Sequence, residues 1–466
     1  MKYSKLTSLL NLFTGIFLVL SACSSPKEQP LKIVSKPNVI FVMVDDLGYG
    51  DLGSFGQQVV PTPNLDEMAA EGIRFTNCYS GSPVCAPARS TLMTGMHTGH
   101  TTVRGNKSQV PVPAELSGNP GRVPLNPEDI TIAEVLKDAG YVTGITGKWG
   151  LGEPGSVGVP NEQGFDQWLG YLNQKRAHDH FIDYFWHNKD TLWLEGNDAA
   201  FNKSNVTFSH NLFTDFALDF IENNKDTSFF LYLPYCLPHD HYHISDEDLV
   251  NFKDKDWTEN EKVYAAMVAK IDRDMGHIMT KIADLGLDEN TMIFFCSDNG
   301  AARRWEGRFD SSGKLRGRKR DMYEGGIRTP MIVRMPGKVP AGVVSDYPWY
   351  FPDVLPTLAA FTGGSTPEGI DGINVLPEIL GQDLPETERF MYWEFHEGGF
   401  FQAVRWKNWK AVREGLEGKL ELYDLANDEA EQNNISAENP EVVKTIENYL
   451  LTARTKSPYW NPKQLK

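Results

Sequence analysis

The sequence predicts an α/β protein with a large doubly wound sheet domain and a smaller C-terminal antiparallel sheet that is followed by a helix. Unbroken apolar runs recur through much of the chain, segments with helical periodicity lie between them, and short alternating runs gather after residue 385. Unbroken runs are typical of parallel strands buried on both faces, and strands that alternate with helices build doubly wound domains. A chain of 466 residues exceeds one compact core, so we expect a domain over residues 37–385 and a subdomain over residues 386–466.

Three mainly apolar runs are expected to form strands of the large sheet, over residues 37–44, 229–233 and 291–296. Polar residues follow each run, and ligands of open α/β sheets bind beyond the carboxyl ends of the strands. One crevice should therefore collect residues that are far apart in the sequence: Asp45, Asp46, His239, Asp298 and Asn299.

Helices are expected where the apolar residues recur at helical spacing. The segment 131–140 begins with Thr131, carries Glu134 in a capping-box position and stops at Gly140. A longer helix is expected from about residue 259 to residue 285. In the C-terminal subdomain we expect strands near residues 391–395, 401–405, 409–413 and 420–424, and a helix over residues 440–453.

The N-terminal residues have the pattern of an export signal. Lys2 and Lys5 precede a short apolar run, which ends in a Leu-Ser-Ala-Cys tetrapeptide that resembles a bacterial lipobox. We expect residues 1–22 to be a lipoprotein signal peptide, Cys23 to carry the lipid, and residues 23–36 to be a tether. The protein would then be an exported bacterial lipoprotein anchored in the outer membrane. The alternative is an ordinary signal peptide with an incidental cysteine.

The charge balance restricts the partners. The formal net charge is −17, which disfavours nucleic acid, so an anionic substrate would need a local concentration of positive charge. The segment 303–320 contains eight basic residues, of which we expect some to contact a polyanionic substrate; the alternative is a solvated loop.

Two pairs of residues at strand ends suit a metal ion. Asp45 with Asp46 and Asp298 with Asn299 offer only oxygen ligands, as Ca²⁺ and Mg²⁺ prefer. Neighbouring buried carboxylates also repel one another unless a cation neutralises them. The alternative is that these residues only cap turns.

Cys85 is the candidate nucleophile. Pro87 suits a first helical turn, so Cys85 should lie just before a helix N-terminus, where free backbone N–H groups favour an anion. Arg89 adds positive charge one turn later. The alternative is a buried structural cysteine.

The segment Cys85–Gly95 resembles the signature of the formylglycine-dependent sulfatases of the alkaline-phosphatase superfamily, Cys-x-Pro-x-Arg followed by Leu and Thr-Gly. The resemblance extends over nearly the whole chain after the tether, and the chain also resembles bacterial arylsulfatase A-like polysaccharide sulfatases. It includes Asp45-Asp46, Gly147-Lys148-Trp149, Pro238-His239, Ser297-Asp298-Asn299-Gly300 and Tyr323-Glu324-Gly325-Gly326-Ile327-Arg328.

The resemblance implies roles for individual residues. A maturase would oxidise Cys85 to formylglycine (3-oxoalanine), and calcium, in preference to magnesium, would be bound by Asp45, Asp46, Asp298, Asn299 and the modified Cys85. Arg89 would hold the formylglycine hydrate, and the sulfate would be surrounded by Lys148, His239 and Lys319. His239 would protonate the leaving alcohol. Gly150 departs from the pattern, since many relatives have His there.

The resemblance implies a sulfuric ester hydrolase acting on sulfated polysaccharides or oligosaccharides, either of algal type, such as ulvan or carrageenan, or glycosaminoglycans. The first alternative is a phosphodiester or phosphonate monoester hydrolase of the same superfamily. The second is a catalytically inactive lipoprotein that binds sulfated glycans.

Three further residues are candidates for binding the sugar. His178 and His180 stand among aromatic residues, a combination that suits a sugar site and equally suits a loop packed against the core, and Arg316 lies in the basic segment.

Overall fold

The computed structural model describes residues 36–108, 122–199, 202, 204–305, 307–385 and 388–462, which belong to one compact unit, Lys36–Lys466. The predicted signal peptide 1–22, the lipidation site Cys23 and all of the tether before Lys36 lie outside the described residues. Among the helices described, none is long and apolar enough to cross a membrane.

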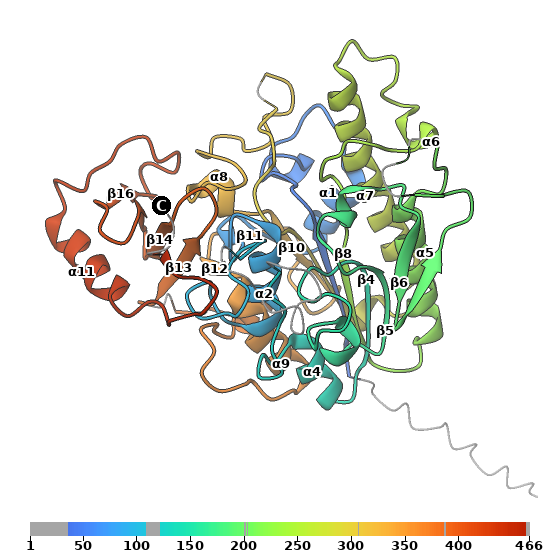
Figure 1. Ribbon diagram of the computed structural model, residues 1–466, viewed down its shortest axis with the longest axis horizontal. Coiled ribbons are helices and arrows are strands. Elements are labelled where there is room, and N and C mark those ends of the chain that lie inside the picture. The colour runs from blue at the N-terminus through green and yellow to red at the C-terminus, as the bar shows by residue number, and fades with distance from the viewer. Residues whose placement is uncertain are drawn as a thin grey trace, which may run out of the picture. The chain divides into compact units, whose positions relative to one another are not determined.

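A ten-stranded mixed sheet forms the centre of this unit (Figure 1). In spatial order its strands are β11 (Val343–Ser345), β2 (Ile73–Phe75), β10 (Met331–Arg334), β9 (Thr291–Ser297), β1 (Asn38–Val44), β8 (Phe229–Pro234), β4 (Val142–Lys148), β5 (Gln167–Tyr171), β6 (Tyr184–His187) and β7 (Asp190–Trp193). Strands β9, β1, β8, β4 and β5 run parallel, with Val42 of β1 paired to Leu233 on one side and to Phe295 on the other. The predicted parallel strands are therefore immediate neighbours.

The two faces of the sheet carry separate apolar cores, as the doubly wound prediction requires. Alternate residues of β1 divide between them: Ile40 and Val42 belong to one cluster, and Phe41 and Met43 to the other. The first cluster includes side chains of α1 (Pro63–Ala70), α5 (Ser209–Asn223) and α7 (Glu259–Asp284). The second includes side chains of α2 (Cys85–Thr94), α4 (Ile132–Asp138) and α9 (Val354–Thr362).

The predicted capping box is present in α4, where the Thr131 hydroxyl accepts a hydrogen bond from the Glu134 N–H and the Glu134 carboxylate accepts one from Thr131. A second capping box, of Thr258 and Glu261, starts α7. Local side-chain chemistry thus determines where both helices begin.

The C-terminal residues form the predicted antiparallel sheet of β13 (Phe390–Phe395), β14 (Phe401–Trp406), β15 (Trp409–Glu414) and β16 (Glu421–Asp424), followed by α11 (Pro440–Leu450). One face of this sheet packs on α11 through Ile446 and Leu450. The other face packs on Tyr79, Val84 and Ile327, which lie in segments that precede the C-terminal subdomain in the sequence. Its apolar faces are therefore both covered.

Short elements complete the fold. A two-stranded sheet pairs β3 (Cys78–Tyr79) with β12 (Trp349–Tyr350). The other helices of the described residues are α6 (Asp246–Leu249), α8 (Glu324–Ile327), α10 (Leu376–Ile379) and the 3₁₀ turns Gly53–Phe55, Pro160–Glu162, Arg176–His178, Asp288–Asn290 and Phe351–Asp353.

Candidate active site

The parallel strands bring the predicted site residues to one edge of the sheet. Asp45 and Asp46 follow β1, Asp298 and Asn299 follow β9, and Lys148 is the last residue of β4. His239 lies in the loop after β8, the strand between β1 and β4. The side chains converge because the carboxyl ends of neighbouring parallel strands meet at the same edge.

Three buried carboxylates form the acidic part of the site: Asp45, Asp46 and Asp298. Successive side chains of a strand point to opposite faces. Asp46 has a left-handed backbone with φ of 69°, so this alternation does not continue from Asp45 to Asp46. The Asp46 carboxylate accepts a hydrogen bond of 2.7 Å from the amide of Asn299. Both strand ends thus contribute to one polar cluster.

Each carboxylate has a cationic partner. The Lys148 ammonium lies 2.6 Å from Asp45, the Arg89 guanidinium 2.8 Å from Asp298, and the Lys319 ammonium 2.7 Å from Asp46. Arg89 also donates to the carbonyl of Lys148 at 2.7 Å, which links α2 to the end of β4. Three carboxyl groups therefore face three cationic side chains.

The pKa values of Asp298 and Asp45 are shifted in opposite directions. Burial and the charge of Asp45 raise the pKa of Asp298 to about 7, despite the neighbouring Arg89. Burial also opposes ionisation of Asp45, but Lys148 and the other nearby cations hold the pKa of Asp45 well below its ordinary value. Asp45 is therefore the stable anion of the pair.

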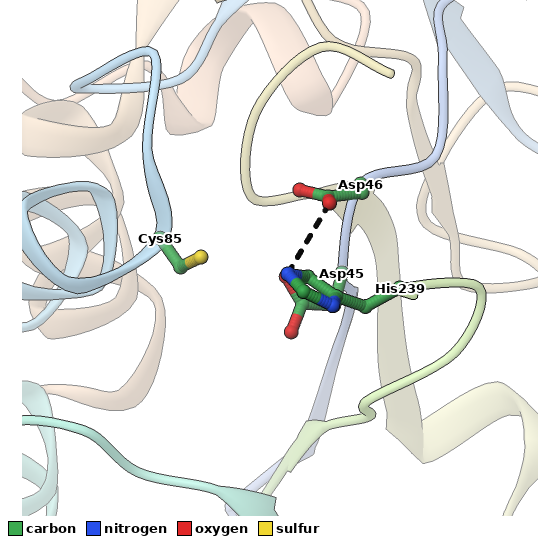
Figure 2. A group of neighbouring side chains, drawn as sticks. All are labelled: Asp45, Asp46, Cys85 and His239. Atoms are coloured by element: carbon green, nitrogen blue, oxygen red, sulfur yellow. Dashed lines mark ion pairs between the residues drawn. The ribbon is translucent and has the colours of Figure 1, made fainter. Parts of the chain in front are cut away.

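The cluster contains oxygen atoms that can serve as ligands of a divalent cation. Two buried oxygens, Oδ1 of Asp45 and Oδ1 of Asn299, have no hydrogen-bond partner among the described residues. Ligand atoms of Asp45, Asp46, Cys85 and His239 also lie within 4.8 Å of one another, and Figure 2 shows the Cys85 sulfur directed toward the other three. Unpaired buried oxygens are costly, and a hard cation is the partner that oxygen ligands prefer. The residues thus fit the predicted calcium.

Cys85 is the first residue of α2, whereas the sequence placed it just before the helix and Pro87 at its start. The helix begins one or two residues earlier than predicted, directly after the extended residue Val84. The Ala86 N–H donates to the side chain of Asn106 at 3.0 Å. Burial raises the pKa of the Cys85 thiol to about 12, despite nearby Lys148 and Lys319.

His239 lies close to one acidic and one basic side chain of the site. Its Nε2 is 3.4 Å from the Asp46 carboxylate (dashed in Figure 2) and 3.1 Å from the Lys319 ammonium. The ring of His178 packs on it with centroids 4.0 Å apart, and Nε2 of His180 lies 3.1 Å from its carbonyl oxygen. These two neighbouring histidines hold His239 in place.

The two histidines predicted to bind sugar also line a cavity of about 540 Å³. Its walls are His178, Asp179, His180, Asn202, His241, Tyr242 and His243. Burial lowers the pKa of His178 to about 2 and that of His180 to about 3, so both rings are neutral at physiological pH. Neutral imidazoles offer hydrogen bonds to hydroxyl groups without attracting anions.

Much of the basic segment is engaged in ion pairs within the protein. Arg316 donates to the Tyr423 hydroxyl and to the Glu431 carbonyl, both at 2.9 Å, and stacks on the ring of Tyr323. Arg308, Lys314 and Arg320 pair with Glu261, Glu429 and Glu397. The structure therefore brings Lys319 into the carboxylate cluster but directs Arg316 to the C-terminal sheet, and a substrate contact of Arg316 stays a prediction.

Two residues near Cys85 were absent from the sequence-based set. Besides Asn106, Arg122 donates to the carbonyl of Asn106, and its charge interacts with Cys85. Both residues lie in loops without periodic pattern, so the sequence carried no signal for them.

Comparison with known proteins shows extended similarity. A family model described as Sulfatase matches residues 37–364, and one described as N-sulphoglucosamine sulphohydrolase, C-terminal, matches residues 317–456. N-acetylgalactosamine-6-sulfatase of Canis lupus familiaris is 32% identical over 432 residues, which are 86% of this chain and 78% of that protein. Arylsulfatase A of Homo sapiens is 33% identical over 416 residues, which are 82% and 75% of the two chains.

Solved structures share the architecture. The crystal structure of Ps i-CgsB in complex with k-i-k-neocarrahexaose has a TM-score of 0.78 and 27% identity, over 92% of this chain and 96% of that one. The phosphonate monoester hydrolase of Agrobacterium radiobacter has a TM-score of 0.65 and 19% identity, over 90% and 95%, a likeness of fold alone.

Proposed function

The chain belongs to the sulfatase family and is a sulfuric ester hydrolase, and we propose that it desulfates sulfated polysaccharides or oligosaccharides with a formylglycine made from Cys85. The observation that carries the mechanism is the buried Cys85 thiol, which starts α2 beside the carboxylates and cations of the strand ends. The site residues and their roles belong to this proposal.

The thiol itself suits this chemistry poorly. With a pKa raised to about 12, Cys85 stays protonated at neutral pH, and a thiol attacks only as thiolate. A formylglycine hydrate supplies an oxygen nucleophile in its place. The surroundings support that replacement, because Arg89 and Lys148 present positive charge where a hydroxyl would have to lose its proton.

Calcium, in preference to magnesium, is proposed to be held by Asp45, Asp46, Asp298, Asn299 and the modified residue 85. A bound divalent cation lowers the pKa of a hydroxyl ligand and balances charge on sulfuryl oxygens. Since the three carboxylates already face three cations, a divalent cation gives the site a surplus of positive charge. That surplus attracts a sulfate ester to a protein whose net charge is −17.

The remaining groups act on the sulfate and the leaving alcohol. Lys148 and Lys319 stabilise negative charge that grows on the sulfuryl oxygens during cleavage. A sugar alcohol leaves poorly unless it is protonated, and His239 is the proposed donor because its Nε2 lies beside Lys319 and Asp46.

The substrate is proposed from the relatives and from the cavity. One similar protein is an N-acetylgalactosamine-6-sulfatase, and a similar structure holds a neocarrahexaose, so algal and glycosaminoglycan glycans both remain candidates. The cavity beside His239, with the neutral rings of His178 and His180 in its wall, suits the hydroxyl groups of a sugar. Export as a lipoprotein anchored through Cys23 in the outer membrane, and activation by a maturase, complete the proposal.

The peptide that contains Cys85 tests the nucleophile. Protein coexpressed with a formylglycine-generating maturase should yield that peptide with the mass of the aldehyde or its hydrate. Failure to convert Cys85 with several competent maturases would contradict the proposal.

Converted protein should then hydrolyse defined sulfated oligosaccharides faster than aryl phosphate diesters at matched concentrations. Faster phosphate or phosphonate cleavage would favour the hydrolase class that shares the fold. Glycan binding without turnover would indicate an inactive binding protein. Turnover of small aryl sulfates only would refute the glycan substrate.

A further inference from the structure

Gln174 is a buried polar side chain that lacks hydrogen-bond partners. It is 4% exposed, and neither its Nε2 nor its Oε1 has a partner among the described residues. Buried amides are almost always hydrogen-bonded, because burying them unpaired is unfavourable. Such a group therefore indicates a place where a bound molecule supplies the missing hydrogen bonds.

The amide of Gln174 occupies the space of a side chain at position 150. A Cβ atom on Gly150 would lie 1.8 Å from Nε2 of Gln174, and Gly150 has a left-handed backbone with φ of 80°. A side chain at position 150 and the amide of Gln174 would therefore compete for the same space.

This place adjoins the carboxylate cluster. The N–H of Trp149 donates to the carbonyl of Tyr171 at 2.9 Å and that of Gly150 to Leu172 at 3.2 Å, so the ends of β4 and β5 extend together. Gly150 is two residues from Lys148, whose carbonyl binds Arg89 at 2.7 Å. Two residues span at most roughly 7 Å, so Gly150 and the Gln174 amide beside it lie just beyond the carboxyl end of β4, the edge at which ligands of such sheets bind.

The chemistry of the amide selects its ligand. Oε1 needs a donor and Nε2 needs an acceptor, whereas a sulfuryl oxygen only accepts and a cation only attracts the oxygen. A hydroxyl group can satisfy both atoms. We propose that Gln174 is a positioning residue that hydrogen-bonds a hydroxyl group in the active-site crevice. This inference rests on the proposed function, which offers two sources: a hydroxyl of the sugar or the hydrate at position 85.

Gln174→Met tests the proposal, because methionine keeps the volume of glutamine and removes its hydrogen bonds. The matched control is Gln163→Met: Gln163 is also buried with an unpartnered Oε1, but its Nε2 donates to Val157 at 3.0 Å. Both variants and the wild type are compared after conversion of Cys85 has been verified by mass. Each is assayed with a sulfated oligosaccharide, an aryl sulfate and an aminooxy probe that labels the aldehyde.

We expect Gln174→Met to lower kcat/KM about tenfold, the effect of one hydrogen bond, without lowering the melting temperature. If the hydroxyl belongs to the sugar, the loss is confined to the oligosaccharide. If it belongs to the hydrate, both substrates lose turnover and the probe labels position 85 faster.

The proposal is overturned if Gln174→Met matches the wild type in turnover and labelling, or if Gln163→Met produces the same losses. A lower melting temperature that accounts for the lost activity would also overturn it, because that indicates packing. A converted wild type that hydrolyses no sulfate ester defeats the proposed function instead. In that case an unchanged labelling rate in Gln174→Met overturns this inference as well.

Discussion

Replacing Lys148 with methionine should expose how the charges at the site depend on one another. The Lys148 ammonium and the Asp45 carboxylate are 2.6 Å apart and both fully buried. Without Lys148, the ion-pair partner that Asp45 retains among the described residues is the more distant guanidinium of Arg89, at 3.8 Å. Breaking a buried ion pair by removing one partner costs about 3–5 kcal/mol, because the other charge is left uncompensated. We expect a loss of that size in metal-free Lys148→Met.

Calcium should recover much of this stability but not the activity. A divalent cation bound to Asp45 provides the opposite charge that Lys148 supplied, so the loss in excess calcium should be less than half of the loss in EDTA. Turnover should fall about 10²–10³-fold even with calcium, because a group that stabilises transition-state charge is missing. Urea unfolding in both buffers measures the free energies, and hydrolysis of an aryl sulfate measures turnover.

Lys270→Met is the matched control. Lys270 is a buried lysine of α7 whose ammonium lies 2.8 and 2.9 Å from the two oxygens of Asp274. Asp274 also contacts His210 and Thr214, none of which belongs to the proposed metal site. This variant should lose the same stability in EDTA and in calcium. Equal losses of Lys148→Met in the two buffers, or none in EDTA, would refute the assignment of Asp45 to a metal site that shares charge with Lys148.

Three further predictions address the nucleophile, the metal and pH. Cys85→Ala should abolish turnover with little change in the urea midpoint, and residual sulfatase activity would contradict the proposed nucleophile. Asp298→Ala should abolish calcium binding, measured by calorimetry, together with activity, since Asp45, Asp46 and Asn299 alone cannot complete the oxygen ligands. Burial and the charge of Glu324 raise the pKa of Glu431 to about 7 from 4.5, despite Lys410. The stability that the protonated Glu431 side chain contributes is complete below about pH 4.5 and is lost as the pH rises through about 7. The wild type should therefore lose stability relative to Glu431→Gln between about pH 5 and pH 8. Parallel pH profiles of the unfolding midpoint would show that Glu431 keeps an ordinary pKa.

The long elements of the fold follow from local sequence. The runs at 37–44, 229–233 and 291–296 became β1, β8 and β9 with ends shifted by at most one residue, and α7 ends one residue before the predicted limit. A strand buried on both faces must be apolar throughout, and a capping box starts a helix wherever its two side chains stand. The helix α11 ends at Leu450, three residues before the predicted limit, because helix ends depend on weak contacts.

The margins of the large sheet, where antiparallel pairings occur, were not predicted. Strands β2 and β11 have three residues each, too few to show a period, and β2 pairs with β10 across more than 250 residues of sequence. Pairing over such distances is decided by packing and not by local propensity.

The sequence by itself determined which residues meet at the strand ends, because polar residues after neighbouring parallel strands must gather at one edge. It indicated Asp45, Asp46, Asp298 and His239 in this way, and Cys85 through its helix start. Only the tertiary structure decided which cation serves which acid: Lys319 reaches Asp46, whereas Arg316, three residues before it, turns to Tyr423. It also decided that Gln174 fills the space at Gly150. Long side chains on irregular loops choose partners by distance in space, and no periodicity in the sequence encodes that distance.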